Sequence, residues 1–145
     1  MYDAINNVDE NGIWMLQTWM FYFSKTNSFW NNQSVQAFLN GVRNDEVILL
    51  DVYSEQHPVY NLFDSFYGKL FIWNAVSTFG GKDGFYGSLD NISVGLINAL
   101  EYPNTSVVGV GSMLEGIWTN YIVFDMTLKM AYCDADNPMN ETMFI

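Results

Sequence analysis

The sequence predicts an α/β fold built from parallel βα units. Half of the 145 residues are apolar, which is enough for a substantial core. Short apolar runs alternate with segments of helical periodicity, and the runs start a few tens of residues apart. That spacing leaves room for the right-handed crossovers that parallel strands require. The units could form a small open sheet or part of an eight-stranded (β/α) barrel.

Four apolar runs are the expected strands. The first, residues 13–21 (IWMLQTWMF), is rich in aromatic residues and bounded by polar segments. The second, residues 47–53 (VILLDVY), is short and continuous, as strands covered on both faces tend to be. Residues 70–76 (LFIWNAV) and 106–110 (SVVGV) complete the set.

Three helices are expected between and after these strands. Their expected N-caps are Asn31-Asn32, Ser88, and Thr119 or Asn120. The last residues, 134–145, lose periodicity and are expected to lead out of the domain formed by residues 1–133. The apolar residues at helical spacing are Val35, Phe38, Leu39 and Val42 in the first helix; Leu89, Ile92, Leu96 and Leu100 in the second; and Tyr121, Phe124, Leu128 and Ala131 in the third.

Two features favour part of a barrel over an open sheet. Polar and aromatic residues gather where the predicted strands end, and barrel active sites lie at that edge. A glycine segment, Gly80-Gly81 with Gly84 and Gly87, follows the third strand. Its spacing does not match the dinucleotide-binding fingerprint, so as a plain loop these glycines only permit tight turns.

Charge and composition exclude several functions. Five Lys and Arg against 16 Asp and Glu give a net charge of −11, which repels nucleic acid and anionic membranes. With one cysteine and one histidine, Cys133 and His57, the chain offers no internal disulfide and no His-based metal or haem site. No cofactor is expected. Cys133 on the last helix is an expected core thiol, and His57 before a proline an expected loop residue.

Targeting signals are few. The start of the chain lacks the basic and apolar regions of a signal peptide, and no apolar run approaches the roughly 18 residues of a membrane span. Four N-x-S/T sequons nevertheless lean toward the secretory pathway. They begin at Asn32, Asn91, Asn104 and Asn140.

Glu115 is the strongest candidate for chemistry. It follows an apolar strand in VVGVGSMLEGIW, among large apolar neighbours. At a barrel strand end its carboxylate would point into the site, where a glycosidase needs a carboxyl on each side of the scissile bond. The alternative is a loop residue, or a carboxylate favoured by the dipole at a helix start.

Asp51 and Glu55 lie at and just after the end of the second predicted strand. A buried strand carboxylate is costly unless it is hydrogen-bonded or functional. Asp51 is therefore either a functional residue or a structural one that satisfies neighbouring backbone amides. Either carboxyl could also be the acid that pairs with Glu115.

Trp19 and Trp73 lie within predicted strands, close in sequence to other aromatic residues. Flat indole surfaces cover the apolar C–H faces of sugar rings well. Ordinary core packing is the competing interpretation for each of them.

Four blocks in order resemble the catalytic barrel of the alpha-N-acetylglucosaminidase family, and they extend over almost the whole chain. The resemblance implies a retaining exo-hydrolase that removes terminal alpha-linked N-acetylglucosamine, with Glu115 as the nucleophile and Trp19, Asp51 and Trp73 lining the sugar pocket. It also implies a carbohydrate substrate, heparan sulfate in the lysosomal members, and thus a lysosomal or secreted protein. The blocks are WMLQTWMF (14–21), ILLDVYSEQHPVY (48–60), FYGKLFIWNAVSTFGG with GFYG after it (66–87), and PNTSVVGVGSMLEG (103–116) with the helix that follows it.

The chain departs from the family pattern at several points. The family's acid/base glutamate belongs to an earlier barrel strand, which this sequence does not contain. Thr18 stands where the family has glycine, Leu114 where it has proline, and Ser77-Thr78 where it has His-Asn. The chain is therefore predicted to be the later half of the barrel, a fragment that associates with a complementary half or with itself. A non-catalytic sugar-binding remnant and a small α/β interaction module are the alternatives.

Overall fold

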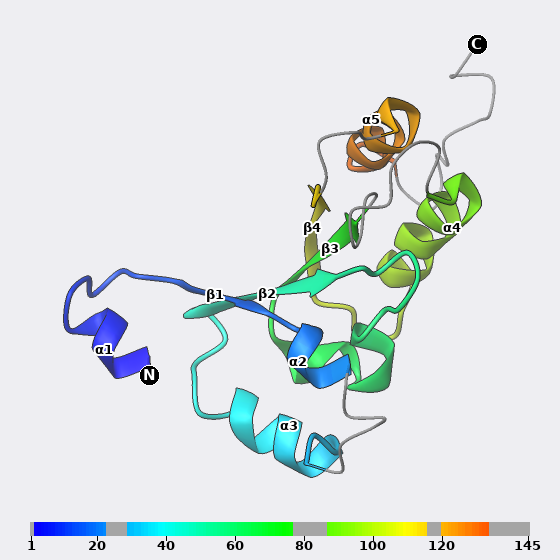
Figure 1. Cartoon of the computed structure of the whole chain (residues 1–145). Coiled ribbons are helices and arrows are strands. Elements are labelled where there is room, and N and C mark those ends of the chain that lie inside the picture. Colours follow the sequence, from blue (N-terminus) through cyan, green and yellow to red (C-terminus); the bar gives the residue numbers. More distant parts are fainter. Residues whose placement is uncertain (1, 23–28, 77–86, 116–119, 134–145) are drawn as a thin grey trace.

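The computed structural model describes residues 2–22, 29–76, 87–115 and 120–133. Its four strands are β1 (Trp14–Gln17), β2 (Val47–Val52), β3 (Phe71–Val76) and β4 (Val107–Met113). They form one sheet in chain order, and each neighbouring pair is parallel (Figure 1). The predicted fold class, parallel βα units, is thereby confirmed. The proposed tail, residues 134–145, lies outside the described residues.

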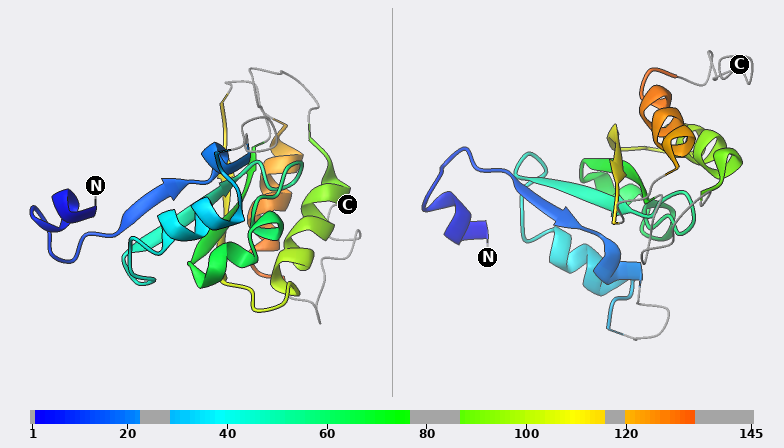
Figure 2. Two further views of the ribbon diagram at one scale, coloured as in Figure 1. Left: turned by 90° about the horizontal axis from the view of Figure 1, so that it is seen from below. Right: turned by 45° about the horizontal axis from the view of Figure 1, so that its top comes forward.

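Helical segments connect the strands. The chain begins with α1 (Tyr2–Asn6), which buries no residue and lies apart from the sheet (Figures 1 and 2). Segments α2 (Trp19–Tyr22) and α3 (Asn32–Leu39) join β1 to β2, and α4 (Leu89–Leu100) joins β3 to β4. Between β2 and β3 there are only two 3₁₀ turns, η2 (Tyr60–Leu62) and η3 (Ser65–Gly68), and α5 (Tyr121–Met130) follows β4 beside α4 (Figure 2).

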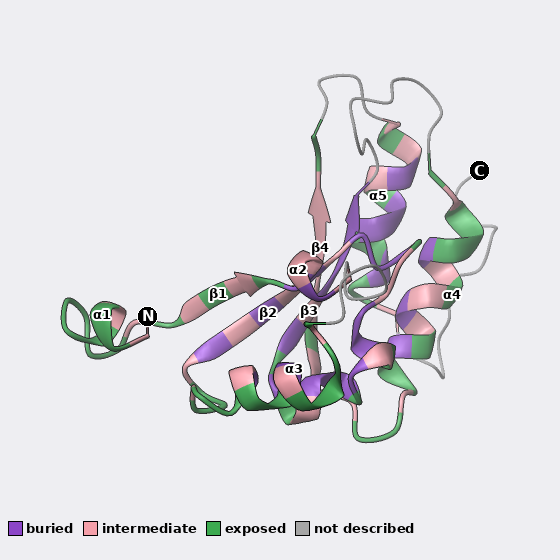
Figure 3. Ribbon diagram, turned by 60° about the horizontal axis from the view of Figure 1, so that its bottom comes forward, coloured by how far each residue is buried: buried purple, intermediate pink, exposed green. Residues whose placement is uncertain are grey.

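The helices α3, α4 and α5 cover one face of the sheet. On β2, Val47, Leu49 and Asp51 are buried on this face, whereas the alternate residues are only partly buried (Figure 3). One continuous hydrophobic cluster joins this face to the helices. Its largest fully buried side chains are Trp73, Phe21, Phe66, Phe71, Leu49, Ile92, Leu96 and Met130.

The helix caps agree with the sequence prediction. Asn31 accepts hydrogen bonds from the backbone of Gln33 and Ser34, and Ser88 accepts one from the backbone of Asn91. Of the two candidates for the third cap, Asn120 fills the position and accepts from the Ile122 N–H. The predicted apolar face of this last helix is wrong. Tyr121 and Leu128 are exposed, and the buried face consists of Val123, Met126, Thr127 and Met130.

The first predicted strand is too long. β1 ends at Gln17, and Trp19 begins a helical turn after Thr18. The N–H of Thr18 still donates to the carbonyl of Leu50, but its own carbonyl accepts from the Phe21 N–H. A short apolar run has no periodicity that separates strand from helix, so the sequence did not show this turn.

The last strand extends beyond the predicted 106–110, through Met113, because Gly111 lets it lie against β3. A Cβ atom on Gly111 would lie 2.0 Å from Oδ1 of Asn74, a distance that no real contact allows. Gly87, by contrast, has a φ of 120° and lies against Val123 of α5. Of the predicted glycine segment, Gly80, Gly81 and Gly84 fall outside the described residues.

Within the described ranges, no helix is both long and apolar enough to cross a membrane.

Candidate active-site rim

The carboxyl ends of the four strands lie along one edge of the sheet, here called the rim. Because all strands are parallel, their last residues, Gln17, Val52, Val76 and Met113, lie at this same edge. Active sites of (β/α) barrels are built from the segments that follow the strands at this edge. The rim is therefore where the predicted site residues have to be found.

Glu115 lies at the rim. It follows the last residue of β4 by two positions, and its side chain is exposed. Trp19 likewise follows the last residue of β1 by two positions and is half-buried. The structure thus places both residues at the same edge of the sheet, on the two outer strands.

Trp19 belongs to an aromatic cluster made of Trp19, Tyr22, Tyr53 and His57. The Trp19 and Tyr22 rings are stacked with centroids 5.0 Å apart, and Tyr53 meets Trp19 edge-on at 6.1 Å. The His57 ring lies 4.7 Å from that of Tyr22 and 5.2 Å from that of Tyr53. Sequence reasoning left His57 as a loop residue, although its position shortly after β2, like that of Tyr53, already indicated the rim.

Asp51 is turned away from the open face. Its carboxyl is fully buried on the helix side of β2, where Oδ2 accepts from the N–H groups of Val59 and Tyr60, each at 3.1 Å. Oδ1 lies 2.9 Å from the Thr18 hydroxyl. Burial raises the pKa of Asp51 to about 6, against the lowering effect of these hydrogen bonds. This is the structural role that the sequence left open, and we no longer expect Asp51 to contact a sugar.

Trp73 also lies in the core. Its indole is fully buried between β3 and α4, where a Cβ on Gly95 would lie 3.0 Å from Cζ2 of the ring. Its Nε1 is buried without a hydrogen-bond partner. The reason is strand alternation: Trp73 shares the helix-facing side of β3 with Phe71 and Ala75. Core packing, the competing interpretation, describes Trp73, so the prediction that it lines a sugar pocket is revised.

Glu55 is a buried carboxyl at the rim itself. Its side chain is 7% exposed, and Oε1 accepts from the N–H of Val76, the last residue of β3, at 2.9 Å. Oε2 is buried and has no partner. Burial raises the pKa of Glu55 to about 7, and the hydrogen bond from Val76 only partly opposes this.

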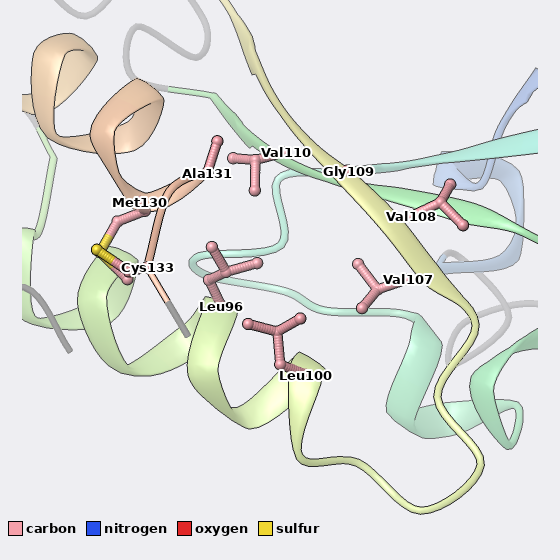
Figure 4. Close-up of a pocket in the computed structure, with 9 residues that line it drawn as sticks. All are labelled: Leu96, Leu100, Val107, Val108, Gly109, Val110, Met130, Ala131 and Cys133. Atoms are coloured by element: carbon pink, nitrogen blue, oxygen red, sulfur yellow. The ribbon is translucent and has the colours of Figure 1, made fainter. Parts of the chain in front are cut away.

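Two cavities border the helix layer. An apolar one of about 230 Å³ lies between β4, α4 and α5 (Figure 4). Its lining side chains are apolar apart from the Cys133 thiol, so it lacks the polar side chains that hold sugar hydroxyls. The other, about 260 Å³, is lined by Glu55 and by polar residues of α4 and η2. In the described part of the chain, no group of three or more His, Cys, Asp or Glu side chains could hold a metal ion.

Comparison with known proteins identifies the family of this chain. Residues 1–134 match the family model described as the alpha-N-acetylglucosaminidase (NAGLU) tim-barrel domain. Human alpha-N-acetylglucosaminidase is 33% identical over 132 residues, which are 91% of this chain and 18% of the human protein. The chain thus spans less than a fifth of the length of this relative.

Solved structures show the same fold. The family 89 glycoside hydrolase from Clostridium perfringens in complex with PUGNAc superposes with a TM-score of 0.76 at 22% identity, over 99% of this chain and 15% of that one. A variant from the same organism, with two glutamates replaced by glutamine and its substrate GlcNAc-alpha-1,4-galactose bound, gives 0.72 at 21% identity, again over 99% and 15%. The family model matches residues 1–134, and the all-parallel sheet agrees with it. The chain therefore belongs to the alpha-N-acetylglucosaminidase tim-barrel domain family of glycoside hydrolases.

Proposed function

We propose that this chain forms the later half of the catalytic barrel of a retaining exo-glycosidase that removes terminal alpha-linked N-acetylglucosamine. Glu115 is the nucleophile of this reaction. The observation that carries the proposal is the position of Glu115: an exposed carboxyl, two residues beyond β4, at the rim that also bears Trp19. The family match and the human relative supply the substrate class.

The chemistry has two steps. A Glu115 oxygen attacks the anomeric carbon while an acid gives its proton to the departing glycosidic oxygen, which leaves a beta-linked glycosyl-enzyme ester. Water, deprotonated by the same second group, then attacks the anomeric carbon and releases the sugar with its original alpha configuration. The two carboxyls must lie roughly 5 to 5.5 Å apart for this mechanism.

The second carboxyl is expected outside the described residues. Asp51 and Glu55, the two candidates in this sequence, are both buried and accept hydrogen bonds from backbone N–H groups. Neither is therefore free to reach a glycosidic oxygen on the open face. In the bacterial structure with bound substrate two glutamates are replaced by glutamine, which is in keeping with a mechanism that uses a pair of glutamates.

The aromatic cluster is the proposed sugar platform. Trp19 combines a large apolar ring with partial exposure, and this ring stacks with Tyr22 and meets Tyr53 edge-on. A rigid indole of this kind suits the C–H face of a pyranose ring. We expect Trp19→Ala to weaken binding of N-acetylglucosamine.

The proposal is tested in a protein that joins this chain to the complementary part of the barrel, with an aryl alpha-N-acetylglucosaminide and three variants: Glu115→Gln, Glu115→Ala and Glu101→Ala. Glu101 is an exposed glutamate at the end of α4, away from the rim, and serves as the matched control. Loss of the nucleophile is expected to lower kcat by about three orders of magnitude or more. Added azide should partly restore turnover of Glu115→Ala and give the beta-glycosyl azide, because azide then attacks the alpha-linked substrate directly. An alpha-azide product, or undiminished turnover, would show that Glu115 is not the nucleophile.

The sugar-binding remnant is the second candidate. It is favoured by one observation: of the three carboxyls that the sequence places near the site, only Glu115 is exposed. Binding of N-acetylglucosamine that is lost in Trp19→Ala, with no turnover even when the complementary part of the barrel is present, would support this candidate. The lysosomal or secreted location stays a prediction. The exposed sequon asparagines Asn32, Asn91 and Asn104 allow it to be tested by glycosidase treatment of the secreted protein.

A further inference from the structure

In the turn that follows β2, Tyr53–Glu55, a side chain accepts a hydrogen bond that a backbone carbonyl accepts in a regular sheet. The Ser54 N–H donates to the Asn74 carbonyl at 2.9 Å, one residue later than the register of β2 and β3, in which Tyr53 would be the donor. In that register the Tyr53 carbonyl would accept from the Val76 N–H, but it accepts from the Gln56 and His57 N–H groups of the turn. Here the Glu55 carboxyl accepts that hydrogen bond instead, at 2.9 Å. The side chain of Glu55 therefore completes the sheet at the rim.

The other end of the same turn reaches the aromatic cluster. Tyr53 has a φ of 69°, in the left-handed region that an aromatic residue adopts only when its surroundings require it. The Tyr53 carbonyl accepts from the N–H groups of Gln56 and His57, which closes the turn. With the backbone in this conformation, the Tyr53 ring contacts both Trp19 and His57.

We propose that Glu55 is a positioning residue for the sugar-binding rim. Through the Val76 N–H it joins the end of β3 to the Tyr53–Glu55 turn, and through Tyr53 this turn holds Trp19 in place. The role is distinct from that of the acid that pairs with Glu115, because Glu55 acts through backbone and ring contacts and does not touch substrate. It rests on the proposed function only as far as the rim binds a sugar.

The surroundings of Glu55 suit a neutral carboxyl. The only titratable group besides Glu55 among the residues that line the adjoining cavity is the Tyr60 hydroxyl. Burial alone raises the pKa of Glu55 to about 7, and no charged side chain contributes to the shift. A protonated carboxyl keeps one carbonyl oxygen for the Val76 N–H, and a glutamine side chain can do the same. The lining consists of Ser54, Glu55, Pro58, Tyr60, Asn61, Asn91, Val94, Gly95 and Asn98.

The test compares Glu55→Gln, Glu55→Ala and, as a control in the same cavity, Asn98→Ala. Two readouts report on the structure: hydrogen exchange of the Val76 amide and the nuclear Overhauser contact between the Tyr53 and Trp19 rings. A third is the dissociation constant of N-acetylglucosamine, with KM and kcat measured separately where there is turnover. At pH 5.5, the Val76 amide of Glu55→Ala should exchange at least about tenfold faster than that of the wild type. The contact between the Tyr53 and Trp19 rings should be lost, and the sugar should bind at least about fivefold more weakly. Glu55→Gln and Asn98→Ala should stay within about twofold of the wild type.

The pH profile gives an independent check that does not need Glu55→Ala to fold. Raising the pH from 5.5 to 8 ionises Glu55. After correction for the intrinsic pH dependence of amide exchange, the exchange rate of the Val76 amide should therefore rise in the wild type and stay constant in Glu55→Gln. A Val76 amide that is equally protected in all variants would overturn the inference, as would unchanged sugar affinity in a folded Glu55→Ala. If the wild-type chain binds no sugar at all, the proposed function fails, whereas the exchange and ring-contact results still decide whether Glu55 holds the rim.

Discussion

Replacing Asp51 by alanine is expected to lower the free energy of unfolding by about 3 to 4 kcal/mol. The carboxyl bonds to three buried groups: the N–H groups of Val59 and Tyr60 and the Thr18 hydroxyl. Each group left unpaired in a buried place costs about 1 to 3 kcal/mol. Part of this loss is offset because alanine also removes the desolvation of a buried carboxyl, which is why we expect the lower part of the summed range.

Asparagine at the same position should cost much less, about 1 kcal/mol or below. At pH 5 the folded protein holds Asp51 protonated, because burial raises its pKa to about 6. The Thr18 hydroxyl has two acceptors within reach, Asp51 Oδ1 at 2.9 Å and the Leu50 carbonyl at 3.1 Å, so a neutral Asp51 carboxyl can donate to the Thr18 oxygen while the hydroxyl donates to Leu50. The amide of Asp51→Asn reproduces this arrangement, with its NH₂ toward Thr18 and its oxygen toward the Val59 and Tyr60 N–H groups.

Urea unfolding at pH 5, followed by tryptophan fluorescence, measures both values. Asp90→Ala is the control, since Asp90 is exposed in the first turn of α4 and should change stability by only a few tenths of a kcal/mol. The reasoning is refuted if Asp51→Ala costs less than about 1 kcal/mol, or if asparagine costs as much as alanine. Unchanged stability with lost sugar binding in Asp51→Asn would instead restore the sugar-contact role that the sequence suggested.

Three further predictions concern single residues. The folded pKa of Glu55, about 7, lies above its ordinary value of 4.5, so its contribution to stability is fully present below pH 4.5 and is lost as pH rises through 7. The loss is about 3 kcal/mol between those limits in thermal or urea unfolding, and it should be absent from Glu55→Gln. Gly111→Ala should cost about 1 to 3 kcal/mol in urea unfolding, since the new Cβ would overlap Asn74; a neutral result would mean that the strands can separate there. Asp64 is exposed and has a φ of 46°, so the Asp64→Gly variant should be more stable than Asp64→Ala by about 1 kcal/mol, whereas in a helix alanine is the more stable of the two. A more stable Asp64→Ala variant would count against the left-handed backbone.

The sequence predicted those elements whose signals are local. Asn31, Ser88 and the choice between Thr119 and Asn120 located three helix starts, because a cap side chain bonds to amides only two or three residues away. The strand within residues 47–53 was found from its continuous run of β-branched and aliphatic residues. The crossover after it was not predicted in detail. Positive φ values occur at Asp64, Ser65, Phe66 and Tyr67, and the residue types in this run do not indicate a left-handed backbone.

The candidate site was predicted unevenly for a related reason. Position along the chain is enough to place Glu115 and Trp19 at the rim, since both follow strand ends and all strands are parallel. Which face a strand residue points to depends on register and on where the helices pack. Asp51 and Trp73 carry the residue types of a sugar site, yet their strand positions turn them toward α4 and the η2 loop.

Burial and proximity to the rim are therefore separate properties in this fold, and Glu55 shows why both matter. A residue one step before the end of a strand points either into the helix layer or away from it, and its function follows from that alternation. A residue in the turn beyond the strand escapes the alternation, so its side chain can lie in the plane of the sheet. Glu55 lies in such a turn, and its carboxyl accepts the Val76 hydrogen bond that the Tyr53 carbonyl would accept in a regular ladder. For this reason we expect changes at Glu55 to act on the ends of two strands together, whereas a change at Trp73 should act mainly on the packing of α4.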